Sequence, residues 1–112
     1  MSTITIYHNP KCGTSRNTLA LLQEKGLQPK VVEYLKEGWT KALLQGLLKR
    51  MKAKPRDILR TKEALAADLA EASDSEILAA MVEHPILVNR PIVVTAKGAK
   101  LCRPAEEVLS LL

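Results

Sequence analysis

A chain of 112 residues with a formal net charge of +5 is long enough for one domain whose core is stable without disulfides. Nucleic-acid binding is not predicted, because only three residues are aromatic and no long basic block is present, so the positive field would instead attract small oxyanions. The first residues show no secretory signal, and no stretch is apolar enough for a membrane span. We therefore expect a cytoplasmic monomer in which a reactive thiol is more plausible than a disulfide between its two cysteines.

The first stretch of the chain predicts a strand, a turn and a helix. Thr3 to Tyr7 alternates with the period of two of a strand, whereas Leu19 and Leu22 recur at helical spacing. Cys12 lies at the junction, where unpaired backbone N–H groups and the positive end of the helix dipole favour a thiolate. A free cysteine is more often an inert buried side chain, but a polar turn is not where packing places one. The N–H groups would come from the next residues, Gly13, Thr14 and Ser15.

The following residues complete a β-α-β unit and begin a second helix. Gly26 ends the first helix, and residues 31–35 predict a strand parallel to the first. After a turn at Gly38 and Trp39, Thr40 is a good N-cap. The helix that follows has a core stripe of Leu43, Leu44, Leu47, Leu48 and Met51.

The middle of the chain, about residues 40–84, predicts a helical segment between two pieces of sheet. Pro55 suits the first position of a short helical turn, and residues 61–72 have strong helix propensity. Ser73 and Glu76 form a capping box, which predicts the start of a further helix.

The last third predicts two strands and a helix. Because Pro91 would interrupt a central strand, residues 86–89 are expected to form an extended approach and residues 92–94 the strand itself. A turn leads to an antiparallel strand at 99–102. Pro104 suits the first position of a final helix. Its core side would be Val108, Leu109 and Leu112.

This order of elements, with a cysteine after the first strand and an X-Pro before the third, resembles the thioredoxin fold. The resemblance implies an α/β protein with a four-stranded mixed sheet in the order β-α-β, helical insertion, β-β-α. It would form a single domain over residues 1–112, with the insertion at about 40–84.

Four blocks of sequence are specific rather than compositional. They are IYHNPKCGTSRNTL at 6–19, ILR at 58–60, HPILVNRPIVV at 84–94 and LCRP at 101–104. Together they closely resemble the glutaredoxin-dependent arsenate reductases, and the match covers essentially the whole chain. In that family a cysteine in the first motif is the nucleophile, which here corresponds to Cys12. Three arginines bind the oxyanion, and the matching positions are Arg60, Arg90 and Arg103.

The resemblance assigns roles to two further residues. His8 matches the first motif and is implied to favour the thiolate of Cys12. Pro91 is implied to be a cis-proline that lies across from the thiol, so that Arg90 projects into the site. The residues alone leave alternatives open. A solvated or ion-paired side chain is the ordinary reading of Arg60 and Arg103, and His8 could equally be an exposed or capping imidazole. Cys102 is expected to be inert.

Arginine and a thiolate suit arsenate chemistry for simple reasons. Arginine presents a planar fork of donors that stays protonated, and arsenate is a multiply charged tetrahedral anion. An unperturbed cysteine has a pKa of about 8.5, and lowering its pKa by about 2 units requires about 2.7 kcal/mol of differential interaction. A helix N-terminus with one or two nearby cations can supply this.

The resemblance implies that the protein reduces arsenate to arsenite. Cys12 would attack arsenic, glutathione would attack the adduct, and glutaredoxin would resolve the mixed species. Ser15 occupies the position at which a dithiol oxidoreductase has its second cysteine, so an outside thiol must complete turnover. The implied partners are arsenate, glutathione as co-substrate, and glutaredoxin. No bound cofactor and no metal is expected.

Three other classes of protein share part of this pattern. Arsenate reductases built like small tyrosine phosphatases need an arginine six residues after the cysteine, but position 18 is Thr, so this class is excluded. A glutathione-linked thiol reductase with another substrate would have no use for three oxyanion-binding arginines. Regulators of this fold that bind RNA polymerase characteristically carry a two-cysteine switch, which Cys12 and Ser15 do not provide.

Overall fold

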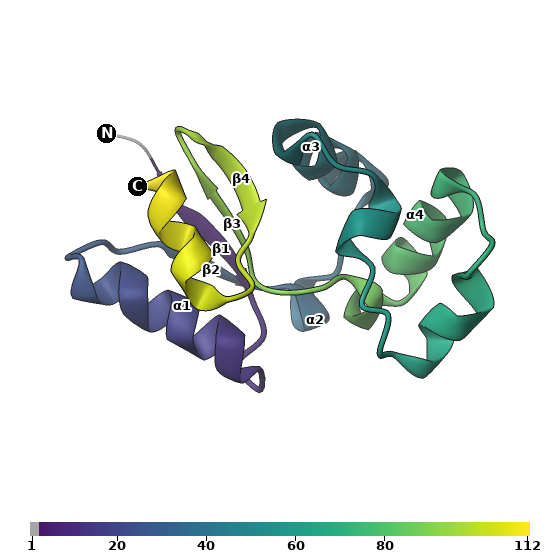
Figure 1. The fold of residues 1–112 in the computed structure, drawn as a ribbon, viewed down its shortest axis with the longest axis horizontal. Coiled ribbons are helices and arrows are strands. Elements are labelled where there is room, and N and C mark those ends of the chain that lie inside the picture. Colours follow the sequence, from purple (N-terminus) through teal and green to yellow (C-terminus); the bar gives the residue numbers. More distant parts are fainter. Residues whose placement is uncertain (1–2) are drawn as a thin grey trace. The chain divides into compact units, whose positions relative to one another are not determined.

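The computed structural model describes residues 3–112, and the contacts within it divide the chain into two compact units (Figure 1). The first unit comprises the chain up to Glu37 together with Arg90–Leu112. The second unit is Gly38–Asn89, which contains the residues of the predicted helical insertion. No helix in the described part of the chain is long and apolar enough to cross a membrane.

The first unit is built on a four-stranded mixed sheet with the strand order β2-β1-β3-β4. β1 pairs in parallel with β2 and antiparallel with β3, and β3 pairs antiparallel with β4. The helix α1 (Gly13–Glu24) makes the crossover between the two parallel strands. The predicted mixed sheet is therefore confirmed, and its strands are β1 (Thr5–His8), β2 (Lys30–Glu33), β3 (Ile92–Thr95) and β4 (Gly98–Leu101).

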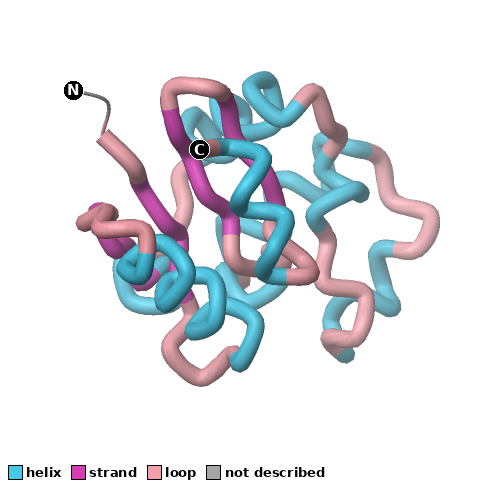
Figure 2. The backbone as a smooth tube through the Cα atoms, turned by 60° about the vertical axis from the view of Figure 1, so that its left-hand side comes forward, coloured by secondary structure: helices cyan, strands magenta, loops and turns pink. Residues whose placement is uncertain are grey.

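The core of this unit lies between one face of the sheet and two helical segments. α1 and the 3-10 helix η4 (Ala105–Leu111) cover that face side by side (Figures 1 and 2). Each fully buried Leu, Ile or Val contributes about 1.5–3 kcal/mol relative to an exposed one, so this cluster fixes how α1 sits on the sheet. Its buried members are Ile6, Leu22, Val93, Cys102, Val108 and Leu111.

Two elements of the first unit differ from the sequence prediction. The strand predicted at 31–35 ends at Glu33, because the fully buried Tyr34 begins a short helix, α2 (Tyr34–Glu37). The last segment is a 3-10 helix in which Pro104 is the N-cap rather than the first helical residue. A 3-10 helix has three residues per turn, so its buried positions recur every third residue. The prediction that Leu109 belongs to the core is consequently wrong, since it is 44% exposed, and the buried set is Ala105, Val108 and Leu111.

The second unit consists of helical segments that begin where their caps predict. Thr40 caps α3 (Lys41–Met51) by accepting a hydrogen bond from the Leu43 N–H at 3.1 Å. Ser73 and Glu76 form the expected capping box at the start of α4 (Asp74–Glu83). Three short 3-10 helices complete the unit: η1 (Pro55–Ile58), η2 (Ala64–Leu69) and η3 (Pro85–Leu87).

Two predictions in this unit need correction. Only the six residues of η2 are helical between 61 and 72, and they form a 3-10 helix. Ala66 is the one buried residue of η2, so packing does not reinforce the high helix propensity. Residues 86–89 are not a simple extended approach, because η3 occupies their first half. The remainder forms an isolated antiparallel bridge between Val88 and Leu59.

Candidate active site

Cys12 is the N-cap of α1, as the sequence predicts. Its backbone is extended, with φ −97° and ψ 123°. Its N–H donates to the Asn9 carbonyl at 3.0 Å, and its own carbonyl accepts from the Arg16 N–H at 3.0 Å. The thiol is thereby held at the start of a helix, where the backbone N–H groups of the first turn are directed toward it.

Cys12 is only 7% exposed, and its thiol lies among hydrogen-bond donors. Burial has the largest single effect on its pKa and raises it. The backbone N–H of Ser15, the positive charge of Arg90 and hydrogen bonds from Arg103 and Arg90 together outweigh burial, so the pKa of Cys12 is lowered from its ordinary value. The Nη1 atom of Arg103 lies 3.7 Å from Sγ. A larger share of thiolate near neutral pH follows.

Arg90 and Arg103 reach the thiol because of the antiparallel pairing of β3 and β4. Arg90 comes two residues before β3 and Arg103 two residues after β4, so the pairing of Ile92 with Leu101 places both arginines at the same end of the sheet. Nη1 of Arg103 also donates to the Arg90 carbonyl at 3.0 Å. The guanidinium of Arg103 is thus oriented by the backbone beside the thiol.

The proline predicted to be cis is found in that conformation. The Arg90–Pro91 peptide bond is cis, and the Arg103–Pro104 bond, for which no such prediction was made, is cis as well. The Pro91 carbonyl accepts from the Cys102 N–H at 2.9 Å, which ties the residue before Arg103 to the segment that carries Arg90.

His8 reaches the site through Ser15. Its Nδ1 lies 2.5 Å from the Ser15 hydroxyl oxygen, which also accepts the Asn9 N–H at 3.1 Å. Burial lowers the pKa of His8 below its ordinary value. The negative charge of Glu33 raises this pKa and the positive charge of Arg16 lowers it, and the net shift is downward. A lowered pKa favours the neutral imidazole, in which one ring nitrogen donates and the other accepts.

The predicted N–H donors have separate roles. The backbone of Ser15 is the one bonded to the thiol, and Gly13 and Thr14 precede it in the first turn of α1. The Thr14 carbonyl accepts the Thr18 hydroxyl at 2.8 Å, a contact within the helix. The predicted site residues do not include Asn9, whose side-chain oxygen accepts the Lys11 N–H at 3.0 Å. Asn beside Pro in a turn is the signal that could have predicted this contact.

Arg60 belongs to the second unit and follows η1. Its Nη1 pairs with an Oε2 of Glu63 at 3.2 Å, and its backbone N–H donates to the Leu87 carbonyl at 2.8 Å. Both side chains of this ion pair are about a quarter exposed. An oxyanion that binds Arg60 would compete with the carboxylate of Glu63.

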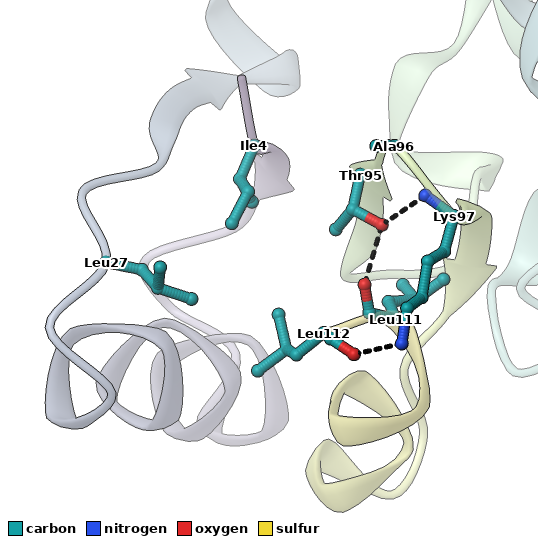
Figure 3. Close-up of a pocket in the computed structure, with 7 residues that line it drawn as sticks. All are labelled: Ile4, Leu27, Thr95, Ala96, Lys97, Leu111 and Leu112. Carbon is teal, nitrogen blue, oxygen red and sulfur yellow. Dashed lines mark hydrogen bonds between the residues drawn. The ribbon is translucent and has the colours of Figure 1, made fainter. Parts of the chain in front are cut away.

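Other features of the described chain are less suited to catalysis than the surroundings of Cys12. A cavity of about 310 Å³ in the first unit is lined by Ile4, just before β1, and by residues of the β3–β4 turn and the end of the chain (Figure 3). Cys12 follows the other end of β1. Its lining is mostly aliphatic, and its Thr95 and Lys97 side chains bond to backbone carbonyls of Leu111 and Leu112. Cys102 is fully buried, and burial raises the pKa of its thiol to about 12. Residues 3–112 contain no cluster of three His, Cys, Asp or Glu side chains that could hold a metal ion.

Comparison with known proteins places this geometry in context. A family model described as "ArsC family" matches residues 7–111. An arsenate reductase of Synechocystis sp. is 57% identical over 113 residues, covering 97% of this chain and 81% of the relative. An arsenate reductase of Escherichia coli K12 is 45% identical over 116 residues, covering 100% and 82%. The solved structure of an arsenate reductase from Vibrio cholerae matches with a TM-score of 0.92 and 42% identity over 98% of each chain. These matches confirm the predicted thioredoxin-like fold.

Proposed function

This chain belongs to the ArsC family, and from that premise we propose that it reduces arsenate to arsenite with the thiolate of Cys12 as nucleophile. The observation that carries the proposal is the environment of the sulfur. One backbone N–H and two guanidinium groups lower its pKa at the start of α1. The same two arginines present donors to whatever anion approaches the sulfur.

The first step is attack of Sγ of Cys12 on arsenic. Arg90 and Arg103 hold arsenate oxygens through charge-assisted hydrogen bonds, each of which contributes about 1.5–3 kcal/mol. One oxygen leaves as water after taking up protons, and a sulfur–arsenic bond forms while arsenic stays As(V). We propose Arg60 as the third arginine of this site on the strength of the family resemblance, with arsenate competing against Glu63 for its guanidinium.

The later steps need two outside thiols, which we propose to be glutathione and glutaredoxin. Glutathione thiolate attacks arsenic and displaces a second oxygen as water. The glutaredoxin thiolate then attacks the glutathione sulfur. The bond between glutathione sulfur and arsenic breaks, and its electron pair stays on arsenic, which becomes As(III) while still bonded to Cys12. A mixed disulfide of glutaredoxin and glutathione leaves, and water releases arsenite from Cys12.

The position of Ser15 supports this need for outside thiols. In a dithiol oxidoreductase a second cysteine three residues after the nucleophile resolves the intermediate. Here that residue is a fully buried serine whose hydroxyl is engaged by His8 and Asn9. A cytoplasmic location, where glutathione is abundant, would suit the proposed reaction.

The test is an arsenate-dependent NADPH consumption assay coupled through glutathione reductase. We expect turnover with the complete mixture and none when glutathione or glutaredoxin is omitted. Cys12→Ser should abolish reduction. Turnover that persists in Cys12→Ser would end the proposal, and turnover only with a thioredoxin system would exclude the glutathione and glutaredoxin steps.

A further inference from the structure

Arg16 reaches back over the turn that presents Cys12. It is the fourth residue of α1, and side chains of a helix tilt toward its N-terminus. Its Nη1 donates to the Pro10 carbonyl at 2.9 Å. Its Nη2 lies 3.8 Å from the position that a Cβ on Gly13 would occupy. The guanidinium is therefore held beside the backbone of the turn from Pro10 to Gly13.

The charge of Arg16 helps to lower the pKa of His8, but it has no direct role at the sulfur of Cys12. The groups that lower the pKa of Cys12 are Ser15, Arg90 and Arg103, not Arg16. No carboxylate in the described chain forms an ion pair with Arg16, and its side chain is exposed. The bond to Pro10 uses one of the five N–H donors of the guanidinium. An oriented, exposed fork of donors thus remains beside the turn.

We propose that Arg16 binds a carboxylate of the glutathione molecule that attacks the Cys12 adduct, an inference that rests on the proposed function. Two kinds of anion must reach the sulfur in that reaction. Arsenate binds at the sulfur, where Arg90 and Arg103 already provide donors. Glutathione carries two carboxylates that lie several bonds from its thiol, so a cation displaced from the sulfur suits it. The planar guanidinium matches a carboxylate in a bidentate geometry.

A purely structural role for Arg16 makes a different prediction. If the bond to Pro10 only braced the turn, its loss would move Cys12, and the thiol pKa and the KM for arsenate would change together. A carboxylate-binding role changes the KM for glutathione and leaves those two quantities alone. This effect on KM should also disappear when the carboxylates of glutathione are esterified.

The experiment compares Arg16→Gln with Arg16→Lys and with Lys11→Gln, which removes a neighbouring exposed charge from the same turn. The KM for glutathione and for its diethyl ester are measured at saturating arsenate and glutaredoxin. We expect Arg16→Gln to raise the KM for glutathione about fivefold to tenfold, with Arg16→Lys intermediate and Lys11→Gln within about twofold of wild type. Equal increases for glutathione and the ester, an equal effect of Lys11→Gln, or a changed KM for arsenate would overturn the inference.

A second measurement needs no arsenate and separates this inference from the proposed function. The Cys12 thiolate attacks one sulfur of oxidised glutathione, forming a mixed disulfide and releasing glutathione thiolate. We expect Arg16→Gln to slow this reaction about fivefold to tenfold while leaving alkylation by neutral iodoacetamide unchanged. A protein inactive toward arsenate that shows this pattern would remove the proposed function and keep the role of Arg16. Unchanged rates with oxidised glutathione would remove the role of Arg16.

Discussion

The guanidinium of Arg103 lies 3.7 Å from the sulfur of Cys12, although 91 positions separate the two residues in the chain. The same nitrogen donates to the Arg90 carbonyl, so the hairpin of β3 and β4 holds this cation beside a helix that begins near the other end of the sequence. Arg103 therefore stabilises the negative charge of the Cys12 thiolate, and the Arg90 carbonyl holds its guanidinium in the orientation that this requires.

The first prediction concerns Arg103→Ala. Arg103 lowers the pKa of Cys12, so its removal should raise that pKa and reduce the thiolate fraction near neutral pH. It should also lower kcat/KM for arsenate by about 10-fold to 100-fold, the expected loss for one charge-assisted contact. The pH dependence of iodoacetamide alkylation measures the thiol pKa directly. An unchanged alkylation profile would show that the 3.7 Å contact has no electrostatic effect.

The second prediction is that the two thiols differ in reactivity. Because the pKa of Cys12 is lowered and that of Cys102 is raised to about 12, one thiol should react with Ellman's reagent in the native protein and two after denaturation. Cys102→Ala should retain the fast thiol, whereas Cys12→Ser should lose it. Two fast thiols in the native protein would contradict the burial of Cys102.

The same pKa shift fixes the sign of a pH effect on stability. The folded chain favours the Cys12 thiolate, so this group contributes stability above its unfolded pKa of about 8.5, and the contribution is lost as pH falls through the lower folded value. The free energy of unfolding of wild type relative to Cys12→Ser should accordingly rise with pH up to about 8.5. Urea titrations at several pH values measure it, and the effect of Cys102 cancels because both proteins contain it.

How much of the site could be predicted depended on the range of the contacts involved. Local signals placed Cys12 at a helix start, because a strand, a polar turn and a helical period adjoin within a few residues. The meeting of Arg90 and Arg103 depends on strand pairing, and the residues alone favoured a solvated side chain for Arg103. The family resemblance supplied what local patterns could not. The 3-10 form of η4 escaped prediction because residues at a spacing of three fit either type of helix over one or two turns.

The fourth prediction tests the buried link from His8 to the first turn of α1. Ser15→Ala would leave the Asn9 N–H and the His8 Nδ1 without their shared hydroxyl in a buried position. We expect a loss of about 1–3 kcal/mol in the free energy of unfolding. Thr14→Ala removes a hydroxyl from the same turn and serves as the matched control, with a smaller loss expected. Equal losses in the two variants would mean that the Ser15 hydroxyl has no special structural role.

The last prediction concerns Arg56, which stabilises the second unit independently of the chemistry in the first. Its guanidinium donates to the carbonyls of Leu69 at 3.4 Å, Ala70 at 3.1 Å and Ala72 at 2.7 Å, at the end of η2. The Leu69 carbonyl also accepts the Ala72 N–H at 3.1 Å, and η2 buries only Ala66, so packing adds little to the order of this end.

Arg56→Ala should therefore release this end of η2, with a loss of about 1–2 kcal/mol because the contacts are exposed. Hydrogen exchange of the amides of residues 64–72 should accelerate more than that of α4, since local opening precedes global unfolding in segments with little buried surface. Lys62→Ala, which removes an exposed charge from the same unit, is the control and should leave this exchange unchanged. Uniform acceleration throughout the second unit would instead mean that Arg56 stabilises the unit as a whole, and unchanged exchange would mean that its three hydrogen bonds contribute nothing to the order of η2.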